Sequence, residues 1–264
     1  MIWNYILILL PAGILAGIAS SVAGLASLVS YPALLLVGIS PVNANVTNTA
    51  ALIFTALGSG AASRRELRGH ARELFKLLPL TVGGSLCGSL LLLAAPATSF
   101  EHIVPFFIFS AALLILWPEL PHFRSRKRRL AEPEKSALLK RISAVAVCAA
   151  VFLVGAYTGY FGAAGGVVML AILSATSHLE FPEYNALKNV SLGASNFVAA
   201  VLFAFRAHIY WLAVLPLAAG FFVGGFIGPH IVRHVPARLL KFIIAAGAIG
   251  LSAFLFIQTY FGLK

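Results

Sequence analysis

Residues 13–24, GILAGIASSVAG, and residues 155–166, GAYTGYFGAAGG, are small-residue stretches inside two strongly apolar segments about 142 residues apart. Three glycines match between them: Gly13 with Gly155, Gly17 with Gly159, and Gly24 with Gly166. No water satisfies the backbone of a membrane helix, so repeated glycines indicate close helix packing or an unwound turn beside a cavity. Matched interruptions in two halves are typical of the binding site of a secondary transporter, which is the function this pattern predicts.

The composition is that of a membrane protein. Of 264 residues, 60% are hydrophobic and 10% are charged, with a mean hydropathy of +0.96, whereas a soluble domain carries about 25% charged residues. A spanning helix needs roughly 20 apolar residues. The candidate segments are residues 2–23, 26–38, 45–62, 77–95, 102–118, 142–160, 163–176, 189–205, 209–229 and 239–261. The pattern predicts an all-α polytopic membrane protein with no soluble domain. Segments 26–38 and 163–176 are short for a full crossing of the bilayer.

The net charge of +11 is concentrated in loops. Sixteen of the 19 basic residues lie in loops 64–76, 124–141 and 233–241. Basic loops stay on the cytoplasmic side of a membrane, so topology explains the charge and no nucleic-acid partner is expected. The lipid bilayer is the expected environment.

These loops set the predicted topology. Residues 1–118 form a first membrane repeat, residues 119–141 a basic cytoplasmic linker, and residues 142–264 a second membrane repeat. Each repeat has five segments, and corresponding segments run in opposite directions. Both ten full crossings and a version in which each glycine-rich break is a re-entrant hairpin near the midplane satisfy the pattern, giving eight to ten segments.

Further matches support the duplication. Pro79 with Gly83 resembles Pro216 with Gly220, and Asn43-Ala44 resembles Asn185-Ala186. The second match places Val46 opposite Lys188.

The sign of the substrate follows from a missing residue type. The chain has no aspartate, and its eight glutamates lie in loops or at segment ends. A cation transporter needs buried carboxylates, whereas the groups near the breaks are hydroxyls, amides, backbone N–H groups and one ammonium, which bind anions. We therefore predict a small anionic substrate, with no cofactor and no metal. Cys87 and Cys148 are expected to be small buried hydrophobes.

The predicted substrate-binding residues come from the two breaks and from the polar faces of the helices that follow them. They are Gly17, Ser20, Ser21, Gly24, Asn45, Thr47, Asn48, Gly159, Gly162, Gly165, Gly166, Asn185, Lys188 and Asn189. Three alternatives stay open: the amides join helices, the glycines only allow close packing, and Lys188 reaches out to the cytoplasmic interface. Arg206 and His208, on the predicted outer side, are candidates for an anion or proton relay.

The break motif, together with Pro32, Pro41 and the Asn-Ala entry to the next helix, resembles the sulfite exporter TauE/SafE family of bacterial membrane proteins. The resemblance covers nearly the whole chain. It implies transport of small sulfur-containing anions, such as sulfite, sulfoacetate or related organosulfonates, across the bacterial inner membrane, with export favoured. The first half departs from the glycine-rich pattern, since Ser20 and Ser21 stand where the second half has Gly162 and Ala163.

Other functions are weighed against export by alternating access. An importer or channel for another small anion fits the same residues, and so does a non-transporting membrane scaffold subunit. An enzyme is not expected, because the sequence contains no HExxH motif, no GxSxG motif and no paired catalytic carboxylates. The oligomeric state is open between a monomer and a homodimer.

Overall fold

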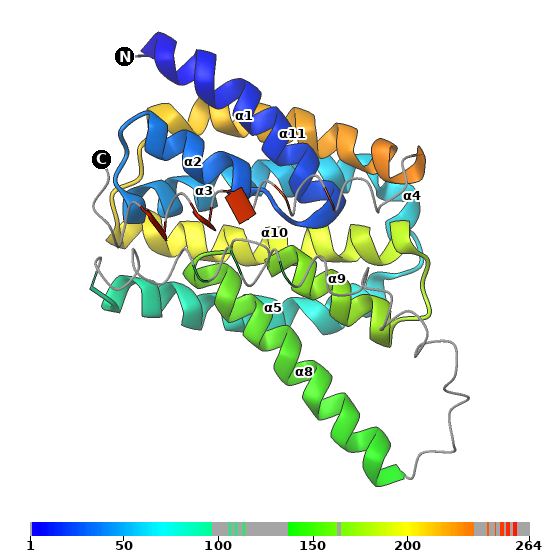
Figure 1. The fold of residues 1–264 in the computed structure, drawn as a ribbon. Helices are drawn as coiled ribbons and strands as arrows, with labels where there is room; N and C mark the ends of the chain where they lie inside the picture. The colour runs from blue at the N-terminus through cyan, green and yellow to red at the C-terminus, as the bar shows by residue number, and fades with distance from the viewer. Residues whose placement is uncertain are drawn as a thin grey trace.

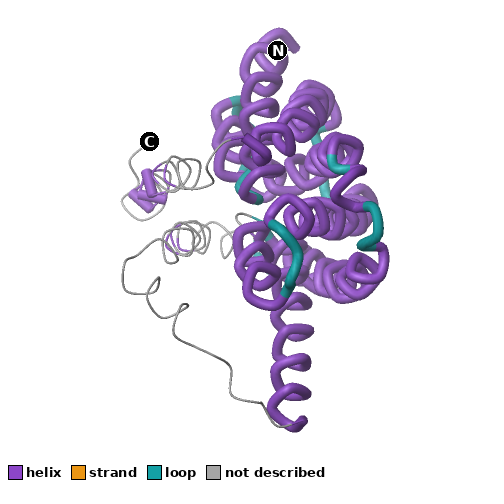
Figure 2. Tube along the Cα trace, turned by 90° about the vertical axis from the view of Figure 1, so that its right-hand side faces the viewer, coloured by secondary structure: helices purple, strands orange, loops and turns teal. Residues whose placement is uncertain are grey.

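The protein is all-α in a computed structural model that describes residues 2–96, 137–162 and 165–234, with isolated positions beyond them (Figure 2). The predicted segments 102–118 and 239–261 and most of the predicted linker 119–141 lie outside these ranges. The helices, labelled in Figure 1, are α1 (Ile2–Ala23), α2 (Ser27–Leu36), α3 (Pro41–Ala62), α4 (Arg64–Leu67), α5 (Ala71–Ala94), α8 (Ala137–Tyr160), α9 (Gly165–Thr176), α10 (Phe181–Arg206) and α11 (Trp211–His234).

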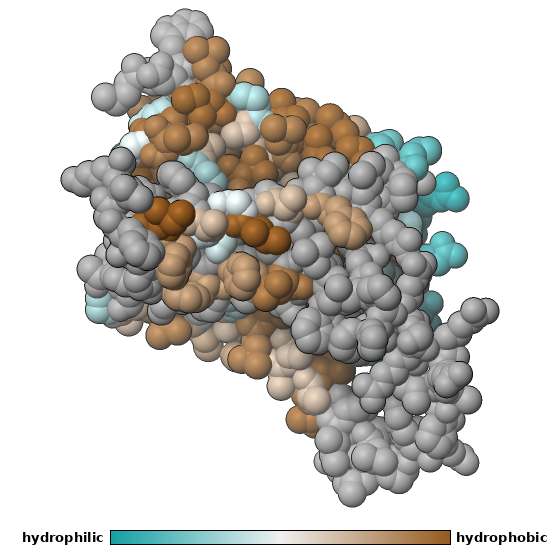
Figure 3. Space-filling model, in the orientation of Figure 1, coloured by the Kyte–Doolittle hydropathy of each residue, from teal (hydrophilic) through white to brown (hydrophobic). Residues whose placement is uncertain are grey.

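Four described helices are long and apolar enough to cross a membrane. They are Tyr5–Ala23 of α1, Ala71–Ala94, Phe181–Arg206, and Trp211–Val232 of α11. The face drawn in Figure 3 is apolar over most of its described area, and hydrophilic side chains gather at the end of the molecule where α4 lies. This distribution confirms the all-α membrane class.

The centre of the molecule is formed by α3 and α10, which pack side by side (Figure 1). They are antiparallel, because Ala56 of α3 meets Gly193 while Gly60, further along α3, meets the earlier residue Val190. Outside this pair, α1 packs along α11, and α8 packs along α5. On each side of the central pair, a helix of the first half of the sequence therefore packs against a helix of the second half.

Glycines make these outer contacts close. A Cβ atom added at Gly17 would lie 2.8 Å from the Phe221 carbonyl oxygen of α11. Gly159 of α8 packs in the same way against the backbone of Ser85 on α5. Gly17 and Gly159, which match in the sequence, thus occupy equivalent positions at helix contacts, where small residues allow backbones to approach.

Each glycine-rich stretch contains a turn between a long helix and a short one. Gly24 follows α1 with φ 78°, and Gly162 follows α8 with φ 72°. The next helices have 10 and 12 residues, so they are about 15 and 18 Å long, near half of the roughly 30 Å hydrocarbon core. The first turn meets the beginning of α9: Gly24 contacts Gly166 so closely that a Cβ atom on either would overlap the other's backbone.

One sequence expectation is wrong. Cys87 and Cys148 are exposed rather than buried, because an apolar helix directs one face at its neighbours and the other outward. The apolar segment 189–205 is the later part of a longer helix, which begins at Phe181 and carries Asn185 and Lys188 in its first turns. Glu183 accepts the backbone N–H of Glu180 at 2.8 Å and completes this start, and the polar first turns are largely buried by protein, so an apolar-run criterion misses them.

Candidate functional site

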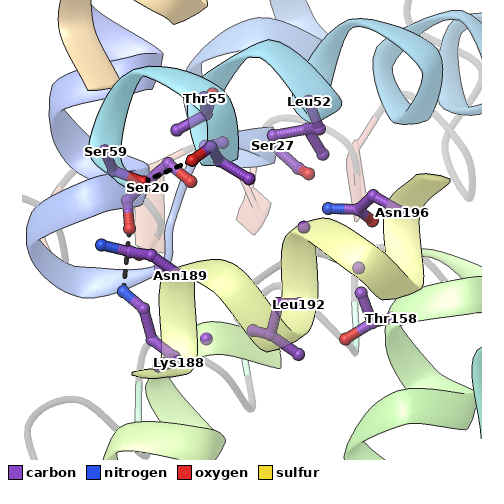
Figure 4. Close-up of a pocket in the computed structure, with 16 residues that line it drawn as sticks. Ser20, Ser27, Leu52, Thr55, Ser59, Thr158, Lys188, Asn189, Leu192 and Asn196 are labelled. Carbon is purple, nitrogen blue, oxygen red and sulfur yellow. Dashed lines mark hydrogen bonds between the residues drawn. The ribbon is translucent and has the colours of Figure 1, made fainter. Parts of the chain in front are cut away.

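A cavity lies where the two turns meet α3 and α10 (Figure 4). The volume of the cavity is about 40 Å³. One water needs roughly 10–15 Å³ on this measure, so the space suits on the order of three waters or one small polyatomic anion. Its polar lining comes from Ser20, Ser27, Thr55, Ser59, Thr158, Lys188, Asn189 and Asn196, and apolar or glycine residues complete the wall.

Lys188 brings a positive charge to this cavity from α10. Its side chain is only 1% exposed, and Nζ donates to the Ser20 carbonyl oxygen at 3.0 Å. Nζ has three donors, so this bond leaves two for another partner. No carboxylate within the described part of the chain pairs with Lys188. Within its described lining, the cavity therefore contains a cationic donor without an opposite charge.

Asparagine side chains cap the C-terminal ends of α1 and α8, the two long helices that precede the turns. Asn185 and Asn189 of α10 donate Nδ2 to the Ser21 carbonyl at 2.8 and 3.1 Å. Asn45 of α3 donates Nδ2 to the Tyr160 carbonyl at 2.9 Å. The last carbonyls of a helix have no partner within it, so α10 caps the end of α1 and α3 caps the end of α8. Each central helix holds the broken end from the other half.

This reciprocal capping favours a different alignment of the two halves from the one that the sequence match gives. Asn45 and Asn185 do equivalent work, whereas the sequence match pairs Asn185 with Asn43. An alignment that pairs Asn185 with Asn45 would place Lys188 opposite Asn48 instead of Val46. Asn48 also faces a short helix, donating to the Ser27 hydroxyl of α2 at 3.0 Å.

A model of the family described as "Sulfite exporter TauE/SafE" matches residues 9–255. The chain belongs to the sulfite exporter TauE/SafE family. A "probable membrane transporter protein" of Haemophilus influenzae is 27% identical over 234 residues, covering 89% of this chain and 88% of the relative. "Probable membrane transporter protein ORF9" of Sinorhizobium sp is 26% identical over 256 residues, covering 92% and 89%. No solved structure matches.

These comparisons confirm the resemblance and identify the chain as a membrane transporter. A third relative, "Probable membrane transporter protein YfcA" of Escherichia coli K12, is 26% identical over 238 residues, covering 89% of this chain and 83% of the relative. The printed names of the three relatives give no substrate.

In this TauE/SafE protein, the cavity brings together part of the predicted binding set. Ser20, Gly24, Gly162, Gly166, Lys188 and Asn189 line it. The other predicted residues support its frame. Asn45, Asn48 and Asn185 form the bonds described above, the Ser21 hydroxyl donates to the Gly17 carbonyl at 2.9 Å, and Thr47 accepts the Tyr210 N–H at 3.2 Å. A Cβ atom added at Gly165 would collide with the Thr158 hydroxyl.

Several lining residues are absent from the predicted set. Thr55 and Ser59 continue the polar face of α3, and Asn196 lies two turns beyond Lys188 on α10. Helical spacing from Asn48 and Lys188 finds them. Thr158 lies inside the second glycine-rich stretch, where the prediction is based on the glycines and not on this hydroxyl.

Arg206 and His208 lie away from the cavity. Both are exposed, and the 18 residues from Lys188 to Arg206 span about 27 Å of helix. The His208 ring packs edge-to-face with Tyr210, with centroids 4.7 Å apart. A relay through these residues stays a prediction.

Proposed function

We propose that this chain is a secondary transporter that exports a small sulfur-containing anion, such as sulfite, sulfoacetate or a related organosulfonate, by alternating access. The observation that carries the proposal is Lys188, buried beside a cavity of small-anion size and paired with no carboxylate of the described residues. The family description supports sulfite as the first substrate to test.

The charge of Lys188 favours an anion for a physical reason. Removing an ammonium from water costs several kcal/mol, and an opposite charge in the same low-dielectric space offsets much of that cost. The other lining groups, including the Ser20 carbonyl, are dipoles. An anion entering the cavity is therefore attracted by one full charge and repelled by none from the described lining.

The packing supports two inverted repeats. Exchanging the two halves replaces α1 by α8 and α11 by α5, so the α1–α11 pair becomes the α8–α5 pair. The helices α3 and α10 are antiparallel at the centre. We divide the helices into two groups, one of α1, α3 and α11 and one of α5, α8 and α10, which meet where α3 packs against α10. Each group draws helices from both halves. The cavity lies between them, so rocking of one group against the other would open it to alternate sides.

The test is counterflow of radiolabelled sulfite in proteoliposomes made from the full chain. Lys188→Met keeps a long apolar side chain but removes the charge, so we expect at least about a 30-fold loss of flux. Lys188→Arg retains a charge in a larger group and should keep part of the flux. Lys76→Met removes an exposed lysine of α5 and should transport like the wild type. Wild-type flux in Lys188→Met would refute the proposal.

A further inference from the structure

Two threonine hydroxyls in the cavity wall have no hydrogen-bond partner within the described part of the chain. Thr55 of α3 is 4% exposed, and Thr158 of α8 is 5% exposed. Both residues line the cavity. Neither Oγ1 atom has a hydrogen-bond partner among the residues that the structure describes. A hydroxyl shielded from bulk water and left unbonded is costly, so each points to a partner that belongs in the cavity.

Other buried hydroxyls of this protein behave differently. Thr49 donates to the Asn45 carbonyl at 2.9 Å, Ser30 to the Ala26 carbonyl at 2.9 Å, and Ser89 to the Ser85 carbonyl at 2.8 Å. This bond to the preceding helical turn is the usual local solution for a serine or threonine inside a helix. Thr55 and Thr158 lie in helices as well, yet they do not use it.

The two hydroxyls and the ammonium come from three different helices. Thr55 lies on α3, Thr158 on α8 and Lys188 on α10, and Figure 4 shows Lys188 and Thr158 toward opposite ends of the lining. A Cβ atom added at Gly165 would lie 2.5 Å from Thr158 Oγ1, so the glycine leaves space at this hydroxyl. One atom cannot contact donors on well-separated walls, but an anion with several oxygens can.

We propose that Thr55 and Thr158 are specificity-determining residues that select a polyatomic oxyanion over a halide. Each hydroxyl donates to one oxygen of an anion with three or more oxygens, while Lys188 holds its charge. The inference rests on the proposed anion transport and deepens it. Both sequence halves then contact one substrate, since Thr55 precedes the linker and Thr158 follows it.

The test measures binding to the purified full chain by calorimetry, with sodium sulfite (kept anaerobic) and sodium chloride as the ligands. Thr55→Val and Thr158→Val keep the side-chain shape and remove the hydroxyl. A hydrogen bond to a charged partner predicts that each lowers sulfite affinity about 10- to 100-fold. Chloride affinity should change less than about threefold, because a halide satisfied at Lys188 does not need both hydroxyls.

Two further variants serve as matched controls. Thr158→Ser retains the hydroxyl and should recover most of the sulfite affinity. Thr81→Val alters a buried threonine outside the cavity lining, whose hydroxyl bonds to the Leu77, Leu78 and Ser191 carbonyls, and it should bind sulfite like the wild type. The ligand-free Thr55→Val and Thr158→Val proteins should melt no lower than the wild type, because each loses an unbonded polar group.

The outcomes separate this inference from the proposed function. If the wild type binds sulfite, Lys188→Met does not, and both valine variants bind it normally, water satisfies the hydroxyls and the inference is overturned alone. An equal loss of affinity in Thr81→Val would also overturn it. If the wild type binds no oxyanion, the proposed function and the inference fall together.

Discussion

Gly24 is under two separate constraints. Its φ of 78° lies in the left-handed region, which side chains with a Cβ atom rarely adopt. Its Cα also contacts Gly166, the second residue of α9, beside the cavity. Gly38 has a similar φ of 85° but nothing within 4 Å of an added Cβ atom. The two glycines therefore allow the cost of the backbone conformation to be separated from the cost of the contact.

We expect Gly38→Ala to lower the free energy of unfolding by about 1–2 kcal/mol, the cost of a left-handed residue. Gly24→Ala should lose about 1–3 kcal/mol more, because the methyl group displaces Gly166. Sulfite flux should fall in Gly24→Ala and stay near wild type in Gly38→Ala. Unfolding in mixed micelles and proteoliposome flux measure both effects. Equal behaviour of the two variants would mean that the Gly24–Gly166 contact is unimportant.

Among the helices, the C-terminal ends of α1 and α8 depend on the central pair, α3 and α10. The broken ends of α1 and α8 are capped by asparagines from α10 and α3, and the cavity lies between these ends. Residues from opposite halves therefore hold each other's turns in place. The bond geometry assigns this role to Asn45, although Asn43 gives the better match in the sequence.

Asn45→Ala should destabilise the protein by about 1–3 kcal/mol, because the buried Tyr160 carbonyl loses its donor. Asn43→Ala should cost less than about 0.5 kcal/mol, as an ordinary substitution outside such a contact. Thermal unfolding in detergent measures the difference. A larger effect at Asn43 would show that the register of the repeats follows the sequence match instead.

At the scale of the molecule, the predicted topology has basic loops 64–76, 124–141 and 233–241 in the cytoplasm and the C-terminus outside. Arg64 to Leu67 form α4 at the end of the bundle where hydrophilic side chains gather (Figure 3). This placement fits a loop outside the hydrocarbon layer. The side on which each loop lies is a separate prediction.

Cysteine labelling in intact bacterial cells tests that topology. The background must carry Cys87→Ala and Cys148→Ala, because both native thiols are exposed on the helices. In this background, Lys264→Cys should react with a membrane-impermeant maleimide, and Arg128→Cys should react only after the membrane is permeabilised. Labelling of both positions from the same side would mean an even number of crossings between them, which would rule out the arrangement of five segments in each half.

Properties of single segments could be predicted from the sequence. Lys188 stands out because it is a cation close to the polar start of an apolar segment, and the structure buries it beside the cavity. The short lengths of α2 and α9 follow from the distance between each glycine-rich stretch and the next proline-marked turn. Membership of the family also follows from these motifs, and the match over residues 9–255 confirms it.

Properties that depend on a partner could not be predicted. The role of Asn45 requires knowing that its amide meets Tyr160, which lies 115 residues away. The unbonded state of Thr158 is visible only when the surrounding acceptors are placed. Cys87 and Cys148 lie in apolar segments in either case, so only the packing of α5 against α8 shows that both thiols point outward.

The polar character of α3 has a consequence for biosynthesis. This 22-residue helix is not one of the four described helices that are apolar enough to cross a membrane. Lipid would leave the hydrogen-bonding groups of its asparagines and threonines unsatisfied. Its partner α10 ends at Arg206, 144 residues after Ala62. At about 5–20 residues per second, the ribosome needs roughly 7–30 seconds to complete it. During that interval α3 requires shelter in the translocation channel or under an insertion chaperone, and a truncated chain ending before α10 should be degraded.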